Sequence, residues 1–164
     1  MAKKKETVTN AMRMLKADNI EFVAVEYEYE GEISDNFGKE ISKKTKIPEN
    51  QSFKTLVIRG ESKGIYVACI PVDKELDLKK AAKILKEKKV EMIHVKELLS
   101  LTGYIRGGVS PVGMKKKYPT LIEESCLLYD KIAISAGVCG CTLLLNPESV
   151  IKVCDATACD IVKD

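Results

Sequence analysis

Residues 52–70 read SFKTLVIRGESKGIYVACI. Two runs of mainly apolar and β-branched residues flank residues 59–64, a polar segment with a glycine near each end, and this pattern predicts two strands joined by a turn. Each run is apolar enough on both faces to be covered on both sides, so the sequence predicts a buried β-hairpin. One charged side chain, Lys54, interrupts the first run.

The position of Lys54 is unusual for a lysine. Successive side chains of a strand point to opposite faces, so Lys54 shares a face with Leu56 and Ile58. The other face carries Phe53, Thr55 and Val57. An ammonium among apolar groups loses hydration, and proteins keep one there when it has a partner or a task. The pattern alone leaves two readings open, a functional lysine and a lysine whose ammonium reaches solvent near the strand start.

Apolar residues at helical spacing surround the hairpin on both sides. They predict helices over residues 6–18, 37–45, 77–89 and 95–101, and another that begins at Asn146-Pro147. Strands are expected over residues 21–27, 90–93, 120–122, 131–135 and 142–145. Helices and strands alternate irregularly, without repeat or linker, which favours one α+β domain over residues 1–164 with a mixed sheet.

Local signals refine these boundaries. Thr7 or Thr9 is expected to cap the first helix, and Ser34 or Asp35 the second. Val8 and Leu78 are placed on the buried stripes of their helices. The helix expected over residues 95–101 should end at Gly103.

Composition describes an ordinary globular chain of 164 residues, with 45% apolar and 31% charged residues. No stretch approaches the ~20 apolar residues of a membrane span, and no apolar run follows the first lysines, so we expect no membrane partner and a cytoplasmic protein. The net charge is +3, and of 27 basic residues only three are Arg. A lysine-rich surface attracts phosphates without reading bases, although a plain solvated surface explains it too.

The cysteines do not form a standard metal pattern. Cys69 and Cys126 lie in apolar runs and are predicted to be core residues. The remaining four lack zinc-site spacing, and the single histidine, His94, reads as a surface or cap residue. We therefore expect no metal, no cofactor and no disulfide. A thiol or metal protein remains the alternative, built on Cys139, Cys141, Cys154 and Cys159.

Residues 104–114 form the second candidate site, a segment that contains Gly107, Gly108 and Gly113. Glycines let a backbone approach a ligand closely and expose its N–H groups, although a surface turn has the same composition. The sequence has no phosphate-binding loop, no dinucleotide fingerprint and no nucleophile elbow. It therefore offers no evident pair of nucleophile and base.

A set of short motifs follows one order along nearly the whole chain. It comprises Tyr27 and residues 36–38, 53–56, 76–82, 88–92, 102–104, 107–111 and 135–137. In this order and spacing the chain resembles the YbaK/prolyl-tRNA synthetase-associated domain family, which includes Cys-tRNA(Pro) deacylases. Each motif is weak by itself, whereas the ordered set is specific.

The resemblance implies a mixed, partly closed, barrel-like β-sheet flanked by helices, with a pocket for the aminoacyl end of a mischarged tRNA. Lys54 matches the lysine of the family's pocket and is expected to be the catalytic residue. Gly107 and Pro111 match its G-x-x-x-P loop. The expected substrate-binding residues are Tyr27, Phe37, Thr55, Gly107, Gly108, Ser110, Pro111, Ser135 and Gly137.

The function that the resemblance implies is trans-editing, in which cysteine is removed from Cys-tRNA(Pro) and the substrate thiol serves as the nucleophile. The expected partners are mischarged tRNA and prolyl-tRNA synthetase, and not DNA. Cys139 and Thr142 stand where bacterial YbaK proteins usually carry a basic and an acidic residue, which leaves the amino-acid specificity open. A non-enzymatic module that binds tRNA or a synthetase through a vestigial pocket is the alternative.

Overall fold

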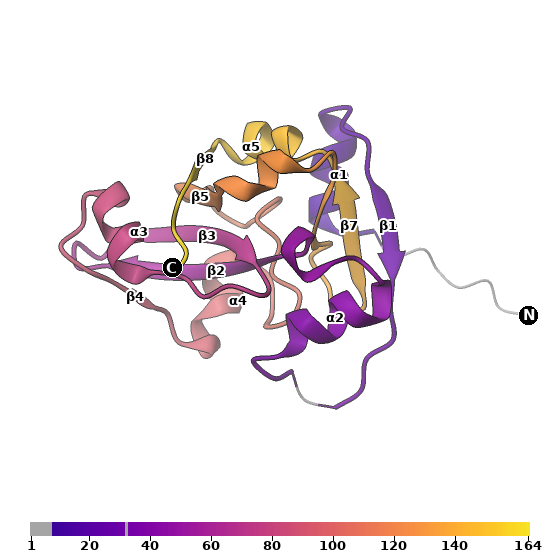
Figure 1. The fold of residues 1–164 in the computed structure, drawn as a ribbon, viewed down its shortest axis with the longest axis horizontal. Coiled ribbons are helices and arrows are strands. Elements are labelled where there is room, and N and C mark those ends of the chain that lie inside the picture. Colours follow the sequence, from indigo (N-terminus) through magenta and orange to yellow (C-terminus); the bar gives the residue numbers. More distant parts are fainter. Residues whose placement is uncertain (1–7, 32) are drawn as a thin grey trace, which may run out of the picture.

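The computed structural model describes residues 8–31 and 33–164. Two sheets form its framework (Figure 1). The larger has five strands in the order β4-β2-β3-β5-β8. These strands are β2 (Phe53–Gly60), β3 (Ile65–Pro71), β4 (Val90–Met92), β5 (Thr120–Glu123) and β8 (Ala156–Cys159).

The expected hairpin is confirmed as β2 and β3. These strands pair antiparallel, from Phe53 opposite Pro71 to Arg59 opposite Ile65. On the other side of β2, strand β4 pairs only with Ile58, Arg59 and Gly60. Strands β3, β5 and β8 pair in parallel, so the larger sheet is mixed, as expected.

The smaller sheet is antiparallel, in the order β1-β7-β6. Its strands are β1 (Val23–Glu26), β6 (Ile132–Ser135) and β7 (Cys141–Leu145). An isolated bridge between Ser52 and Ala133 joins the two sheets. The α+β architecture is confirmed, but the sheets do not close into a barrel, because β2 between this bridge and β4 has no strand at its outer edge in the described residues.

Helices pack around the two sheets (Figure 1). They are α1 (Asn10–Ala17), α2 (Phe37–Thr45), α3 (Leu78–Leu85), α4 (Leu98–Thr102) and α5 (Pro147–Cys154). Side-chain caps set their starts: the Thr9 hydroxyl accepts the Met12 N–H, and the Asn146 side chain accepts the Glu148 N–H. Short 3-10 turns occur at Glu49–Gln51, Val95–Glu97 and Glu124–Leu128.

Several predicted boundaries were wrong. Because Thr9 is the N-cap of α1, Val8 precedes the helix and is 48% exposed, not buried on its stripe. Residue 6 and Thr7, the first residues of the expected helix, lie outside the described residues. The N-cap position of α2 is occupied by Asn36, and not by Ser34 or Asp35 as expected. The helix expected from residue 95 begins as a 3-10 turn, although it does end at Gly103.

Helix α3 ends four residues earlier than expected. Lys86 has a left-handed φ of 58°, which turns the chain so that the Glu87 carboxylate accepts hydrogen bonds from Ser62 and Tyr66 in the hairpin. Leu78 is 37% exposed, because the buried face of this helix begins with Ala81 and Ala82. Strand β8 was not predicted from sequence.

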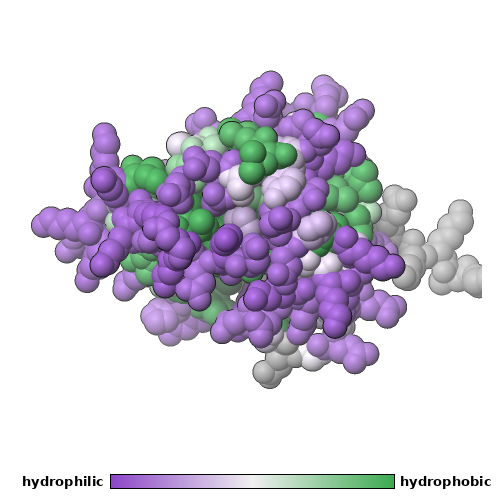
Figure 2. Space-filling view, in the orientation of Figure 1, coloured by the Kyte–Doolittle hydropathy of each residue, from purple (hydrophilic) through white to green (hydrophobic). Residues whose placement is uncertain are grey.

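Apolar side chains from both sheets share one core. The main cluster joins α1, α5 and the two sheets, and it contains Cys69 and Cys126, as expected. A second cluster lies between α3 and the larger sheet. Figure 2 shows that the face turned to the viewer in Figure 1 carries mainly hydrophilic residues, with apolar residues in small separate areas.

Candidate functional site

A cavity of about 430 Å³ lies at the open edge of β2. Residues 53–57 of β2 form one wall, and α2, β6, β7 and the glycine loop (residues 104–114) contribute the others. Apolar residues after β4 line one end. The cavity contains six of the predicted site residues: Tyr27, Phe37, Lys54, Thr55, Gly107 and Ser135. Residues far apart in the sequence therefore meet at one interrupted strand edge.

The backbone of Thr55 points into this cavity. The Val67 N–H donates to Pro119 rather than to β2, so the opposing pair of Val57 and Val67 is a non-hydrogen-bonded pair. Backbone groups of a strand point to opposite sides at alternate residues, so the Thr55 N–H and C=O, like those of Val57, point away from β3. They face the edge at which the Val57 carbonyl accepts the Ile93 N–H. The described residues provide no partner at this edge for the Thr55 N–H and C=O, which are therefore available to a ligand.

Lys54 is half-buried in the cavity wall. Burial lowers the pKa of its ammonium, an effect that Glu75 and, more weakly, Asp35 and Asp73 oppose. None of these carboxylates forms an ion pair with Lys54, and the described residues offer its ammonium no hydrogen-bond acceptor. A cation with lost hydration and no local partner favours an anionic or strongly polar ligand.

Tyr27 and Phe37 contribute aromatic rings to the cavity lining, and Tyr29, which does not line it, packs against them. The Phe37 ring lies 6.2 Å from the Tyr27 ring and 5.9 Å from the Tyr29 ring, measured between centroids in edge-to-face arrangements. Burial raises the pKa of Tyr27 to about 12, so its phenol remains protonated at neutral pH and can donate a hydrogen bond.

The glycine loop is fixed by contacts behind the cavity. The Tyr104 hydroxyl donates to the Val112 carbonyl at 2.6 Å, and the Ser110 hydroxyl accepts the Val112 N–H. The Pro111 carbonyl accepts from the Cys154 thiol. These bonds hold the loop as a rigid wall. Ser110 and Pro111 are buried in this support and do not line the cavity.

Gly107 is the glycine of the loop that lines the cavity. Its φ of +86° favours glycine, and an added Cβ would lie 3.0 Å from the Cys139 Sγ. Gly108 and Gly137 lie behind this surface and do not line the cavity. Whether Gly108, Ser110, Pro111 and Gly137 contact a substrate stays a prediction.

The β6–β7 hairpin contributes two hydroxyls that already have partners. Ser135 accepts the Gly137 N–H at 3.1 Å, and Thr142 donates to the Ile134 carbonyl at 2.7 Å. Both line the cavity. Cys139 lies outside it, where its thiol donates to the Arg106 carbonyl.

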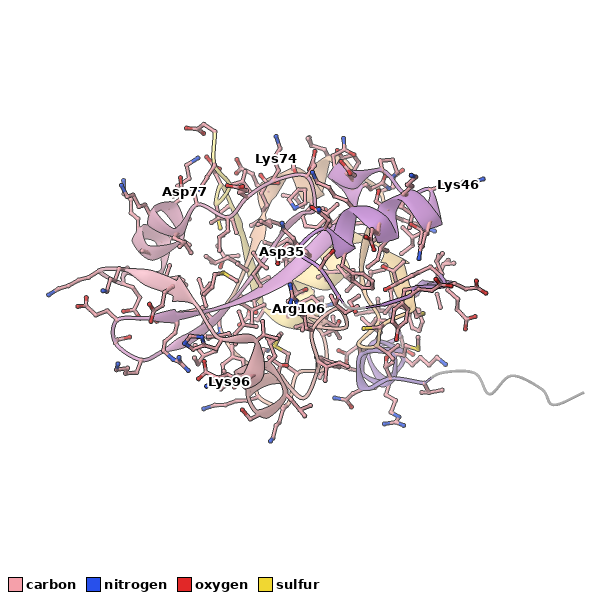
Figure 3. All side chains as sticks on the ribbon, turned by 90° about the horizontal axis from the view of Figure 1, so that it is seen from below. Asp35, Lys46, Lys74, Asp77, Lys96 and Arg106 are labelled. Carbon is pink, nitrogen blue, oxygen red and sulfur yellow. The ribbon has the colours of Figure 1, made fainter. Side chains whose placement is uncertain are left out.

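An ion pair at the cavity that sequence reasoning missed joins Asp35 to Arg106, with 2.8 Å between carboxylate oxygen and guanidinium nitrogen. Figure 3 shows both side chains near the centre of the face seen from below, with Lys74, Lys46 and Lys96 farther out. The pair connects the segment before α2 to the glycine loop, 71 residues apart. No spacing signal in the sequence relates the two residues.

This ion pair should contribute little to stability. The Asp35 side chain is fully exposed and that of Arg106 is 40% exposed, so solvent screens the attraction. We expect Asp35→Asn to leave the free energy of unfolding, measured in urea titrations, within error of the wild-type value. A larger loss would show that the pair holds the glycine loop in place.

All six cysteines are free thiols, and Cys139, Cys141, Cys154 and Cys159 do not converge on one centre. In the described ranges, no group of three or more His, Cys, Asp or Glu side chains is placed to hold a metal ion. No helix of the described residues is long and apolar enough to span a membrane.

Comparisons with known proteins agree on one family. The model of the aminoacyl-tRNA editing domain matches residues 37–153. A curated relative from Enterococcus faecalis, "Putative Cys-tRNA(Pro)/Cys-tRNA(Cys) deacylase EbsC", is 42% identical over 162 residues, which is 98% of both chains.

Solved structures share the fold at lower identity. A protein described as a putative trans-editing enzyme for prolyl tRNA synthetase has a TM-score of 0.80 and 24% identity, covering 97% of this chain and 100% of its own. The hypothetical protein APE2540 has a TM-score of 0.84 and 21% identity, covering 94% and 100%. With its fold, its family match and its near full-length relative in agreement, the chain belongs to the aminoacyl-tRNA editing domain family.

Proposed function

We propose that this protein is a trans-editing aminoacyl-tRNA deacylase that removes mischarged cysteine from Cys-tRNA(Pro). The observation that carries the proposal is the cavity at the open edge of β2, where Lys54 and the Thr55 peptide group have no hydrogen-bond partner among the described residues. The family and the name of the Enterococcus relative support the same reaction class. Mischarged tRNA would then be the first partner and prolyl-tRNA synthetase the second. The expected compartment is the cytoplasm.

The cavity suits a reaction that needs positioning more than a protein nucleophile. An aminoacyl ester is already activated, so the enzyme must hold it and stabilise the oxyanion that develops. We assign the Lys54 ammonium to the terminal ribose or phosphate of the tRNA. Residues 1–164 would then form one editing domain, since both sheets and the glycine loop supply walls of the cavity.

Backbone N–H groups are the candidate oxyanion donors. In the glycine loop the Gly108 N–H already donates to the Ile105 carbonyl, so this N–H is not available. Gly107 and Val109 line the cavity on that side, and the Thr55 N–H faces it from β2. The ester carbonyl would therefore lie between the loop and the strand edge.

The cysteinyl side chain supplies the nucleophile in this proposal. Its sulfur forms a bond to the ester carbonyl carbon, the bond from that carbon to the ribose oxygen breaks, and the thiol proton passes to the departing ribose hydroxyl. The products are a cysteine thiolactone and free tRNA. No protein residue becomes covalently modified, which agrees with the absence of an evident nucleophile and base in the sequence.

Release of labelled amino acid from Cys-tRNA(Pro), Ala-tRNA(Pro) and Cys-tRNA(Cys) tests the function. We expect fast release of cysteine from Cys-tRNA(Pro), and release at least about 100-fold slower when the thiol is S-methylated, because the nucleophile is then lost. Release of alanine instead would keep the reaction class but change the substrate. No release from any of the three would favour the binding module.

A further inference from the structure

Ser52 carries a hydroxyl that the described structure leaves without a partner. The residue directly precedes β2 and is 4% exposed. Its backbone is fully used, since its N–H donates to Glu49 and its carbonyl accepts the Val72 N–H at 2.8 Å. Its Oγ is the one buried side-chain nitrogen or oxygen without a hydrogen bond in residues 8–31 and 33–164.

The other buried hydroxyls of the chain differ from Ser52. Ser42 donates to the Ile47 carbonyl, Thr142 donates to Ile134, and Ser110 accepts the Val112 N–H. Because burial of an unpaired hydroxyl is unfavourable, proteins satisfy nearly all of them, and an exception calls for a specific explanation. The fold itself does not supply one, since Ser52 Oγ bonds no backbone group nearby.

The place of Ser52 supplies the explanation. It lines the same cavity as Lys54, and the two side chains lie two residues apart, on the same face of the β2 segment. Lys54 is half-buried, whereas Ser52 is buried beside the bridge to Ala133, at the junction of the two sheets. The ammonium therefore lies nearer to solvent and the hydroxyl deeper inside.

This order of depth matches the order of groups in an aminoacyl-tRNA terminus. A ligand held by its ribose or phosphate at Lys54 directs its amino-acid side chain inward, towards Ser52. A hydroxyl both donates and accepts a hydrogen bond, which suits a side chain that does the same, such as a thiol or an alcohol.

We propose that the Ser52 hydroxyl hydrogen-bonds the thiol or hydroxyl of a small polar aminoacyl side chain and so selects cysteinyl and seryl esters over alanyl esters. The inference rests on the proposed function and adds to it a specificity-determining residue. Ser52 does not act on the ester itself, so alanyl ester, which has no polar side-chain atom, gains nothing from it.

The test compares the dissociation constants of Cys-, Ser- and Ala-tRNA(Pro) for the wild type and for Ser52→Ala, because the alanyl ester lacks the thiol that our mechanism needs for turnover. We expect about a tenfold loss of affinity for the cysteinyl and seryl substrates, the size of one neutral hydrogen bond, and less than about a twofold change for the alanyl substrate. Ser52→Ala should unfold at the same temperature as the wild type or higher, because it removes an unpaired hydroxyl.

Ser42→Ala is the matched control, since it removes a buried hydroxyl that has a partner. It should lower the unfolding temperature and leave the cysteinyl-to-alanyl ratio unchanged. An equal loss for all three substrates in Ser52→Ala, or no loss for any, would overturn the inference while the deacylase stands. A wild-type protein that releases none of the three would overturn both proposals.

Discussion

Replacement of Lys54 by alanine should reduce deacylation of Cys-tRNA(Pro) by about 100- to 1,000-fold while the protein stays folded. The ammonium is the one cationic group that β2 places in the cavity wall, and in our proposal it fixes the tRNA terminus relative to the oxyanion donors. Single-turnover release of labelled cysteine measures the rate, and circular dichroism checks the fold.

Lys83→Ala provides the control, because Lys83 is an exposed lysine of α3 that does not line the cavity. It should retain wild-type turnover. If Lys54→Ala also turned over at the wild-type rate, Lys54 would not be the pocket lysine that we assign.

The lowered pKa of Lys54 makes this assignment testable by pH. Activity that needs the ammonium should fall as pH rises through a value below 10.5, the ordinary pKa of lysine. Stability should change in the opposite direction. At pH values between the pKa of Lys54 in the folded protein and its higher pKa in the unfolded chain, the unfolded chain binds more protons. The free energy of unfolding therefore rises with pH in that window. Lys54→Met should lack both effects.

A second large effect is expected from Gly108→Ala. An added Cβ would lie 2.9 Å from the Val138 carbonyl carbon and 3.0 Å from the Cys139 nitrogen, which are backbone atoms that cannot rotate away. The glycine loop would have to move off the β6–β7 turn, at a cost of about 1–3 kcal/mol in unfolding free energy. A shift of the loop by about 1 Å would also slow deacylation by about 100-fold.

Gly103→Ala separates this clash from backbone strain. Gly103 has a left-handed φ of +84°, but its added Cβ would meet only ordinary contacts, the nearest at 3.6 Å. It should lose about 1 kcal/mol of stability and little activity, as urea unfolding and the release assay will show. Equal activities in the two variants would mean that the loop position does not matter for the reaction.

Local signals in the sequence were sufficient for the hairpin and for most helices. Residues 53–60 and 65–71 are runs of mainly apolar and β-branched residues with polar turn residues between them, and Asn146 and Pro147 mark a helix start. Strand β8 was missed because its four residues, ATAC, are short and not strongly apolar, and their pairing depends on β5 being present. Pairing of that kind is a tertiary effect.

The candidate site could be predicted only in part. Strand alternation singled out Lys54, and family resemblance supplied Tyr27 and Ser135, but no local pattern indicates that the edge of β2 lies open beside them. The ion pair of Asp35 and Arg106 and the unpaired hydroxyl of Ser52 arise from chain segments that meet only in the folded protein. Such features become visible once hydrogen-bond partners can be assigned.

The six free cysteines have a consequence for acyl chemistry. Burial raises the pKa of every one of them, to about 12 for Cys154 and about 11 for Cys126, and Cys141 lines the cavity itself. The thiolate is the reactive form, so at neutral pH these sulfurs are poor competitors for an activated acyl group. If the reaction yields a reactive thiolactone, as we propose, the raised thiol pKa values would protect the enzyme against acylation of its own cysteines.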